Sequence, residues 1–347
     1  MLSSKAAGVL PRFAFVVHAL SPLHRRVMAV RSARPGLFVG MQDGTSKTDV
    51  LKVCDLRMPS VVDGVVMGVP MVPEALLSDQ ARALDCMAAA VHAAGPVDAV
   101  GLGSLCAVVA GRGEGLAERI DAPVTNGGAA TAWALLENTR AVLARVGTQR
   151  PVAVLGARGP VGGAVTAMLV ADGVDVRVDH ARAGRGLDVQ RADSPAEAVK
   201  GCRVVVGAAT TGGILPAESL AADAVVIDVA IPGVVVGRPG PGVRILAGEA
   251  VSLPLGWSRG FWGWLYHVLA GYGPTQAFAC LVEPLVLALS EDKTPYSLGR
   301  RLDPARVVDF GKGAEALGFT PRLATGWRAF PVEQILPALS VQDSSGQ

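Results

Sequence analysis

The most regular pattern of hydrophobic and polar positions lies in the middle third of the chain. Short, fully apolar runs alternate there with amphipathic stretches, and glycines stand at several of the junctions. Apolar runs bounded by glycine predict buried strands, and the stretches between them have helical spacing. The expected strands are 151–155, 174–179, 203–207, 224–229 and 243–246, and the expected helices are 161–171 and 195–200. Strands that alternate with short helices indicate a parallel sheet with right-handed crossovers.

The flanking regions have weaker patterns. On the N-terminal side, the spacing predicts a strand and turn at 61–72, a helix at 76–94, a buried strand at 97–102 and a helix at 125–146. Beyond residue 252 aromatic residues cluster, and helices are expected at 276–289 and 304–317. We therefore expect an α/β protein in three parts: an N-terminal α/β substrate domain (1–148), a central parallel-sheet domain (149–252) and a C-terminal helical region (253–347).

The composition excludes several classes of protein. Half of the residues are hydrophobic, 18% are charged, and the formal net charge is +2. This composition suits large cores and argues against a disordered chain or a nucleic-acid partner. The five cysteines form no C-x-x-C pair, so we expect neither a disulfide framework nor a metal site. Because we find no clean signal peptide and no apolar run long enough to cross a bilayer, we expect a cytoplasmic protein without a membrane span.

The loop after the first central strand is the clearest candidate for chemistry. Seven residues follow that strand directly: Gly156, Ala157, Arg158, Gly159, Pro160, Val161 and Gly162. A glycine triplet between a buried strand and a helix is typical of dinucleotide-binding Rossmann domains. The first glycine permits the tight turn, the second lets the backbone approach a pyrophosphate, and the third lets the helix pack closely on the strand. The helix N-terminus then presents free N–H groups to the phosphates.

The cofactor expected in this loop is NADPH, with NADH possible. The spacing G-x-x-G-x-x-G departs from G-x-G-x-x-G, and short glycine variants of this kind are common among enzymes that prefer NADP. At the end of the second strand, Asp179 would bind a ribose 2′-OH and favour NAD, whereas Arg182 would hold a 2′-phosphate and favour NADP. Thr210 and Thr211, after the third strand, are candidates for lining the nicotinamide pocket.

Three residues outside the central region are candidate catalytic groups. Cys280 is expected near the start of a helix, where the positive end of the helix dipole lowers the pKa of a thiol. Ser104, after the strand at 97–102, is a candidate hydrogen-bond donor to a carbonyl oxygen. His267 belongs to the aromatic cluster and is a candidate neighbour of Cys280. The other four cysteines have no such setting and are expected to be buried hydrophobic residues.

Several motifs resemble the long-chain acyl-[acyl-carrier-protein] reductases, over about 13–323. The family pattern Q-x-F-A-C-x-x-E matches Gln276, Phe278, Ala279, Cys280 and Glu283. Weaker matches lie at 152–163, at 296–300, at 318–321, and near His18 and Ser104. The resemblance implies NADPH-dependent reduction of an acyl thioester to an aldehyde, with Cys280 carrying the acyl group. Its implied partner is an acyl carrier protein or a coenzyme A thioester.

The chain departs from that family where the acyl group would bind, so other functions stay open. At 125–132 it lacks a polar Asn/His pair of the family, and at 257–272 it has aromatic residues instead of a more acidic sequence. One alternative is a small-molecule NAD(P) dehydrogenase of shikimate-dehydrogenase-like or methylene-tetrahydrofolate-dehydrogenase-like type, which 224–232 resembles. The second alternative is a non-catalytic protein that binds the dinucleotide as a sensor or scaffold.

Overall fold

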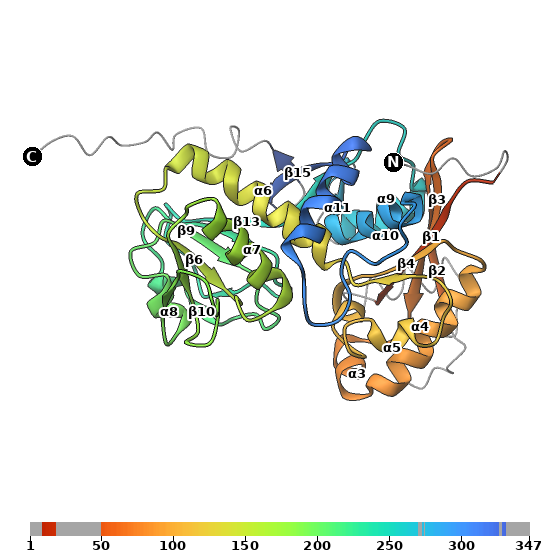
Figure 1. The fold of residues 1–347 in the computed structure, drawn as a ribbon, viewed down its shortest axis with the longest axis horizontal. Helices are drawn as coiled ribbons and strands as arrows, with labels where there is room; N and C mark the ends of the chain where they lie inside the picture. Colours follow the sequence, from red (N-terminus) through yellow and green to blue (C-terminus); the bar gives the residue numbers. More distant parts are fainter. Residues whose placement is uncertain (1–8, 19–49, 270–272, 274, 326–327, 331–347) are drawn as a thin grey trace, which may run out of the picture. The chain divides into compact units, whose positions relative to one another are not determined.

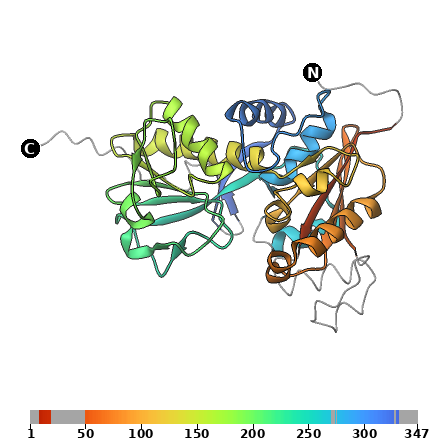
Figure 2. The same cartoon turned by 60° about the horizontal axis from the view of Figure 1, so that its bottom comes forward.

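The computed structural model describes residues 9–18, 50–269, 273, 275–325 and 328–330. The chain forms two compact units (Figures 1 and 2). The first unit contains Met1–Ala130, Leu253–Arg301 and Asp309–Phe319, and the second contains Thr131–Ser252, Leu302–Val308 and Thr320–Gln347. The C-terminal region expected at 253–347 is therefore not a separate compact piece, because its segments are shared between the two units.

The first unit is built on a mixed sheet in the order β2-β3-β1-β4-β5. Strands β1, β3, β4 and β5 are parallel, and β2 pairs antiparallel with β3 at one edge. Their bounds are β1 Arg12–His18, β2 Leu51–Met58, β3 Val62–Val69, β4 Ala99–Leu102 and β5 Val124–Thr125. Because parallel strands share one carboxyl edge, the residues after β1, β4 and β5 gather there.

Helices cover both faces of this sheet. Val100 and Leu102 of β4 belong to the core formed with α4. Gly101, which lies between them in the strand, packs against Pro284 of α10. Successive strand residues point to opposite faces, so α4 and α10 lie on opposite sides. The elements are α3 Pro73–Ser78, α4 Gln80–Ala94, η1 Ser104–Ala107, α5 Glu114–Ala117, α9 Gly260–Leu269, β14 Gln276–Phe278 and α10 Ala279–Leu289.

The second unit has a parallel sheet whose order identifies its fold. The strands run β8-β7-β6-β9-β11-β13, with β15 and β16 added antiparallel beyond β13. Numbered from β6, the parallel part reads 3-2-1-4-5-6, which is the order of the Rossmann fold. The bounds are β6 Val152–Leu155, β7 Val176–Val178, β8 Gln190–Arg191, β9 Val204–Gly207, β11 Val225–Asp228, β13 Arg244–Ser252, β15 Thr320–Thr325 and β16 Arg328–Phe330.

Helices α6 and α8 pack on the sheet of the second unit. Leu135 of α6 approaches Gly248 on β13, and a separate core joins β6, β9 and β11 to α8. The remaining elements of the chain are α6 Gly128–Val146, α7 Pro160–Ala171, α8 Pro195–Ala198, β10 Leu215–Pro216, η2 Ala217–Ser219, β12 Val235–Val236 and α11 Pro304–Ala316. Helix α6 begins in the first unit, and α11 crosses from the second unit to the first.

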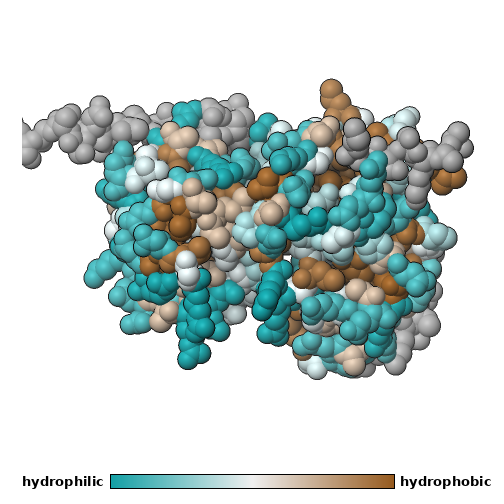
Figure 3. Space-filling model, in the orientation of Figure 1, coloured by the Kyte–Doolittle hydropathy of each residue, from teal (hydrophilic) through white to brown (hydrophobic). Residues whose placement is uncertain are grey.

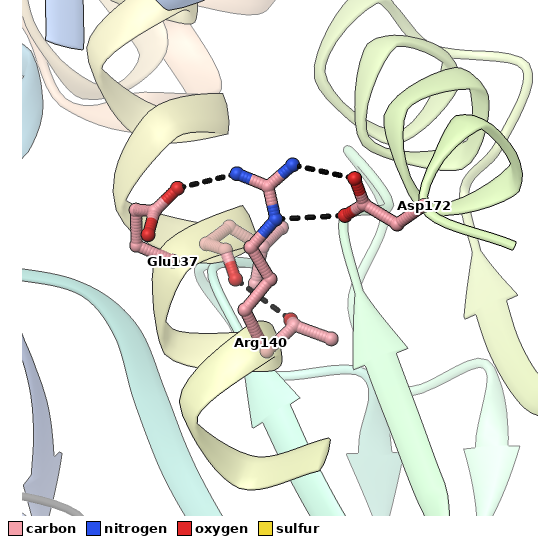
Figure 4. Close-up of polar contacts among 5 residues, drawn as sticks. Glu137, Arg140 and Asp172 are labelled. Carbon is pink, nitrogen blue, oxygen red and sulfur yellow. Dashed lines mark hydrogen bonds and ion pairs between the residues drawn. The ribbon is translucent and has the colours of Figure 1, made fainter. Parts of the chain in front are cut away.

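An ion pair fastens α6 to the end of α7 within the second unit. The Arg140 guanidinium donates to both carboxylate oxygens of Asp172, at 2.7 and 2.9 Å, and to Glu137 at 2.6 Å (Figure 4). These side chains are each more than a third exposed. Screening by solvent therefore limits the contribution of each pair to about 1 kcal/mol or less.

The face of the described residues that Figure 3 draws gives no simple indication of a binding site. On the side drawn in Figure 3, brown hydrophobic residues lie in small areas between teal polar residues on each unit. Scattered apolar surface is ordinary in folded domains and identifies no site by itself. No helix among the described residues is long and apolar enough to span a membrane.

The fold class expected from the sequence, an α/β protein with a central Rossmann sheet, is confirmed. The central strands and α7 lie within a few residues of their expected positions. Three expectations differ in detail. The helix expected at 76–94 is interrupted at Asp79, whose carboxylate accepts from the backbone N–H of Arg82 and so starts α4. The helix expected at 276–289 begins with a short strand, and the C-terminal region contains β14, β15 and β16 as well as helices.

Candidate functional site

The glycine loop of the second unit lies where the strand order reverses. Strand β6 is flanked by β7 on one side and β9 on the other, which is the position where doubly wound sheets bind ligands. Gly156 leaves β6 with φ +85, and a Cβ there would lie 2.5 Å from the backbone nitrogen of Ala209. A Cβ at Gly162 would lie 2.4 Å from the carbonyl oxygen of Gly156. The loop therefore requires glycine at both ends.

Helix α7 begins directly after this loop. Gly159 is its N-cap residue and supplies no side-chain cap, and Pro160 occupies the first turn. The N–H groups of Val161 and Gly162 have no acceptor within the helix, because they belong to its first turn. A helix start without a side-chain cap, next to a bare glycine backbone, is a suitable anion site.

Asp179 links the loop to the end of β7. Its Oδ2 accepts a hydrogen bond from the backbone N–H of Gly156 at 2.8 Å. Its Oδ1 is buried and has no hydrogen-bond partner among the residues that the structure describes. A buried carboxylate oxygen without a donor is costly, so this atom indicates a missing hydroxyl or N–H group. A ribose hydroxyl supplies that donor in dinucleotide-binding proteins.

Two arginines contact His180, the residue that follows Asp179. Arg158 Nη1 is 3.4 Å from Nε2 of His180, and the backbone N–H of Arg182 donates to Nδ1 of His180 at 2.9 Å. Both arginines are exposed. Asp179, an acceptor for a ribose diol, is thus followed directly by a histidine that two arginines contact, and arginine is the residue suited to a 2′-phosphate. The loop geometry therefore does not separate NAD from NADP.

The other candidate cofactor residues follow the neighbouring strand. Thr210 and Thr211 are exposed and come after β9, at the same carboxyl edge as the glycine loop. The adjacent loop is shaped by Asp228, whose carboxylate accepts from the backbone N–H groups of Ala230 and Val234 at 2.9 and 2.7 Å. Burial raises the pKa of Asp228, although these hydrogen bonds oppose the effect.

The first unit has a separate cluster of polar residues at the carboxyl edge of its sheet. His18, the last residue of β1, is buried, and its Nε2 lies 3.0 Å from Ser104 Oγ. The backbone N–H of Leu105 also donates to that nitrogen, at 3.2 Å. Ser104 has φ 53, in the left-handed region, and starts η1 immediately after the β4–Gly103 turn. The sequence indicated Ser104, but not that His18 would be its partner.

Cys280 lies in the first turn of α10, as expected, and is partly exposed, whereas the other four cysteines are buried. A Cβ on Gly127 would lie 2.5 Å from Cys280 Cβ, so the turn after β5 packs directly on this residue. The preceding strand is held by Arg259, whose guanidinium donates to the carbonyl oxygen of Gln276 at 2.7 Å. His267 lies in α9, but its side chain is outside the described part of the structure.

Glu283, one turn after Cys280, connects α10 to neighbouring segments through hydrogen bonds. It is fully buried and accepts hydrogen bonds from Thr125 Oγ1, from Ser297 Oγ at 2.6 Å and from the backbone N–H of Ala130 at 2.8 Å. Burial raises its pKa, although these donors oppose the effect. The carboxyl group therefore joins α10 to β5 and to the start of α6.

Comparisons with known proteins identify a curated relative and several solved structures. No protein-family model matches the chain. "Aminotransferase PigE" of Serratia sp. (strain ATCC 39006) is 27% identical over 278 residues, which cover 74% of this chain and 32% of that protein. The chain thus spans about a third of the length of this relative. The aminotransferase activity in its name is a property of that longer protein.

Three similar solved structures are a reductase and two dehydrogenases. An NADPH-dependent glyoxylate/hydroxypyruvate reductase from Sinorhizobium meliloti is 13% identical, with 68% of this chain and 85% of that chain covered and a TM-score of 0.30. A 5,10-methylenetetrahydrofolate dehydrogenase from the silkworm Bombyx mori is 12% identical, with 89% of each chain covered and a TM-score of 0.31. A D-isomer specific 2-hydroxyacid dehydrogenase from Lactobacillus delbrueckii, complexed with NAD, is 12% identical, with 62% and 70% covered and a TM-score of 0.25.

These comparisons correct the resemblance to acyl-[acyl-carrier-protein] reductases. The curated relative is described as an aminotransferase, and the structures are described as small-molecule dehydrogenases and reductases. None of them is described as an acyl-thioester reductase. Acyl-thioester reduction, and an acyl carrier protein or coenzyme A thioester as partner, were therefore wrong expectations. The expected dinucleotide, NADPH or NADH, agrees with the NADP and NAD named for the similar structures.

Proposed function

We propose that this chain is an oxidoreductase that binds NADP(H) or NAD(H) in its second unit and converts a small alcohol into a carbonyl compound, or the reverse. The observation that carries the proposal is the buried Oδ1 of Asp179, which lacks a donor beside a glycine loop at the point of strand reversal. This corresponds to the small-molecule dehydrogenase that the sequence left open as an alternative.

Residues of the second unit fit the pyrophosphate and a ribose of a dinucleotide. The N–H groups of Val161 and Gly162 would bind the pyrophosphate, and Asp179 Oδ1 would accept from a ribose hydroxyl. Arg158 and Arg182 would neutralise a 2′-phosphate. When bound, the nicotinamide ring supplies the transfer of a hydride. The protein supplies position and charge around it.

Two glycine variants test the cofactor site. A Cβ at Gly159 would lie 3.3 Å from the carbonyl oxygen of Gly156, and a Cβ at Gly163 would lie 3.3 Å from that of Ala157. The local crowding is thus matched, but only Gly159 borders the expected pyrophosphate. We expect Gly159→Ala to weaken NADPH and NADH binding by about tenfold or more, equivalent to about 1.4 kcal/mol. Gly163→Ala should bind like the wild type.

Titration calorimetry with NADPH, its oxidised form and NADH gives the dissociation constants, and circular dichroism checks that both variants fold. Failure of the wild type to bind any of the three would contradict the proposed function. Binding without turnover of any alcohol or carbonyl compound in a broad panel would favour the non-catalytic alternative. Turnover of at least one compound, lost in parallel with binding in Gly159→Ala, would support the proposal.

A further inference from the structure

The turn that precedes α5 in the first unit has a strained backbone. Four consecutive residues have positive φ: Ala110 at 51°, Gly111 at 71°, Arg112 at 60° and Gly113 at 94°. Residues with a side chain adopt this region at an energetic cost, and they do so singly rather than in runs. Contacts of the turn must therefore hold Ala110 and Arg112 in place. Strain of this kind is concentrated at functional sites and ligand clamps.

The contacts that hold the turn also bring a second arginine beside Arg112. The carbonyl oxygen of Arg112 accepts from the backbone N–H of Gly299 at 3.1 Å and from Asn126 Nδ2 at 3.1 Å. The same amide nitrogen of Asn126 donates to the carbonyl oxygen of Gly299 at 3.3 Å. Arg300 follows Gly299 directly, so the two arginines belong to neighbouring loops that one asparagine ties together. Because Asn126 follows β5, these loops lie at the carboxyl edge of the first unit's sheet.

The two guanidinium groups have the same charge, and neither has an acceptor. Arg112 is half-buried and Arg300 is exposed, and neither side chain forms a hydrogen bond or an ion pair with a residue that the structure describes. Burial lowers the pKa of Arg112, and the nearby positive charge of Arg300 lowers it further. A half-buried cation beside a second cation is unfavourable unless an anion neutralises them.

One carboxylate borders these loops without neutralising the pair. Glu114 is exposed, and its side chain lies against Gly111 on one loop and Gly299 on the other. Among the described residues it forms no ion pair with Arg112 or Arg300. Its charge would weakly repel an anion that bound between the two arginines.

We propose that Arg112 and Arg300 bind the phosphate group of a small phosphorylated ligand. The inference concerns the first unit alone and is independent of the dinucleotide. A planar guanidinium presents paired N–H donors that match the oxygens of a phosphate. A phosphate monoester carries about two negative charges at neutral pH, so a single group can neutralise both arginines. A carboxylate, with one charge, would neutralise only one of them.

Titration calorimetry with inorganic phosphate tests the site, at an ionic strength held constant with chloride. We expect Arg300→Gln to weaken binding by about tenfold or more, because a hydrogen bond between charged groups is lost. Arg57→Gln is the matched control and should bind like the wild type. Arg57 is also exposed, but it pairs with Asp63 at the start of β3, among the amino ends of the parallel strands. Glu114→Gln removes the repelling charge and should tighten binding by about two- to fivefold.

A second variant tests the half-buried arginine. Arg112→Asn removes the guanidinium but introduces a residue that tolerates positive φ, and circular dichroism checks that it folds. It should also weaken phosphate binding by about tenfold or more. Arg300→Gln changes only an exposed side chain, so the test stands even if Arg112→Asn does not fold.

Hydrogen exchange with and without phosphate locates the bound anion. We expect protection at 110–113 and 297–301. Protection confined to 156–163 would place the phosphate on the glycine loop of the second unit, which would overturn this proposal and leave the proposed function standing. An absence of binding, or binding that Arg300→Gln leaves unchanged, would overturn it as well. Acetate bound as tightly as phosphate would overturn the choice of a phosphate group.

Discussion

At Gly156 a single additional carbon atom would collide with the backbone of the neighbouring strand's loop. Two features disfavour any other residue at this position: the backbone φ of +85°, and the distance of only 2.5 Å between an added Cβ and the Ala209 nitrogen. Gly173 provides a matched control, because it has φ +77 but nothing within 4 Å of its Cβ position. We expect Gly173→Ala to lower the free energy of unfolding by about 1 kcal/mol through backbone strain alone.

Gly156→Ala should lower it by about 1–3 kcal/mol more, because the collision adds to the strain. Urea unfolding followed by circular dichroism gives both values. Equal losses in the two variants would mean that the loop relaxes around the added methyl group, and the close approach would then not be essential to the fold.

We expect Asp179 to influence the relative affinities for NADH and NADPH. Asp179→Asn keeps an oxygen for the N–H of Gly156 but removes the negative charge from the ribose site. Because a hydrogen bond to a charged group contributes about 1.5–3 kcal/mol, NADH affinity should fall by about tenfold or more. NADPH should lose less, since the charge also repels its 2′-phosphate. Titration of both dinucleotides with Asp179→Asn and with Arg182→Ala measures the two effects, and an unchanged affinity ratio in Asp179→Asn would contradict the assignment.

Among the elements, α10 depends on one buried carboxyl group. Burial raises the pKa of Glu283, so the folded chain binds this proton more tightly than the unfolded chain does. Its contribution to stability is therefore complete below the unfolded pKa and is lost as the pH rises through the folded pKa. Glu283→Gln removes the titration. We expect the unfolding free energy of the wild type to decrease relative to this variant as the pH rises above the range in which an ordinary glutamate titrates.

Urea unfolding at several pH values measures this difference. Glu291→Gln is the control, because it removes an exposed carboxylate just beyond the end of α10. A constant difference between the wild type and Glu283→Gln over the whole range would show that Glu283 keeps one protonation state throughout.

The elements also show what the sequence could predict. Strands β6, β9 and β11 are buried on both faces and, apart from Asp228, consist of apolar residues and glycine, so their pattern alone identified them and, with the glycines, the loop after β6. Strand β15 pairs with β13 from far along the chain, and no local pattern contains that information. For the same reason Ser104 was found but its partner His18, 86 residues away, was not. The donors to Glu283 likewise come from other segments of the chain, and no local pattern connects them to it.

For the whole molecule, the proposed cofactor site lies within one unit. Dinucleotide binding should therefore protect backbone amides of 156–163 and 179–182 from hydrogen exchange, because those N–H groups and their neighbours would become ordered. Mass-spectrometric exchange with and without NADPH tests this expectation, and Gly159→Ala serves as the control. Protection confined to the first unit would place the dinucleotide elsewhere and contradict the proposed function.

The chain passes between the two units at 130–131, 252–253, 301–302, 308–309 and 319–320. One consequence concerns synthesis on the ribosome. The parallel strands through β13 emerge first, but β15, which pairs along β13, follows only after the whole of 253–319 has been made. An unpaired strand side is a template for wrong partners, and long-range pairing is slow. The nascent chain thus carries an incomplete sheet until 320–325 has been made, and this is the interval in which a chaperone would have the most to protect.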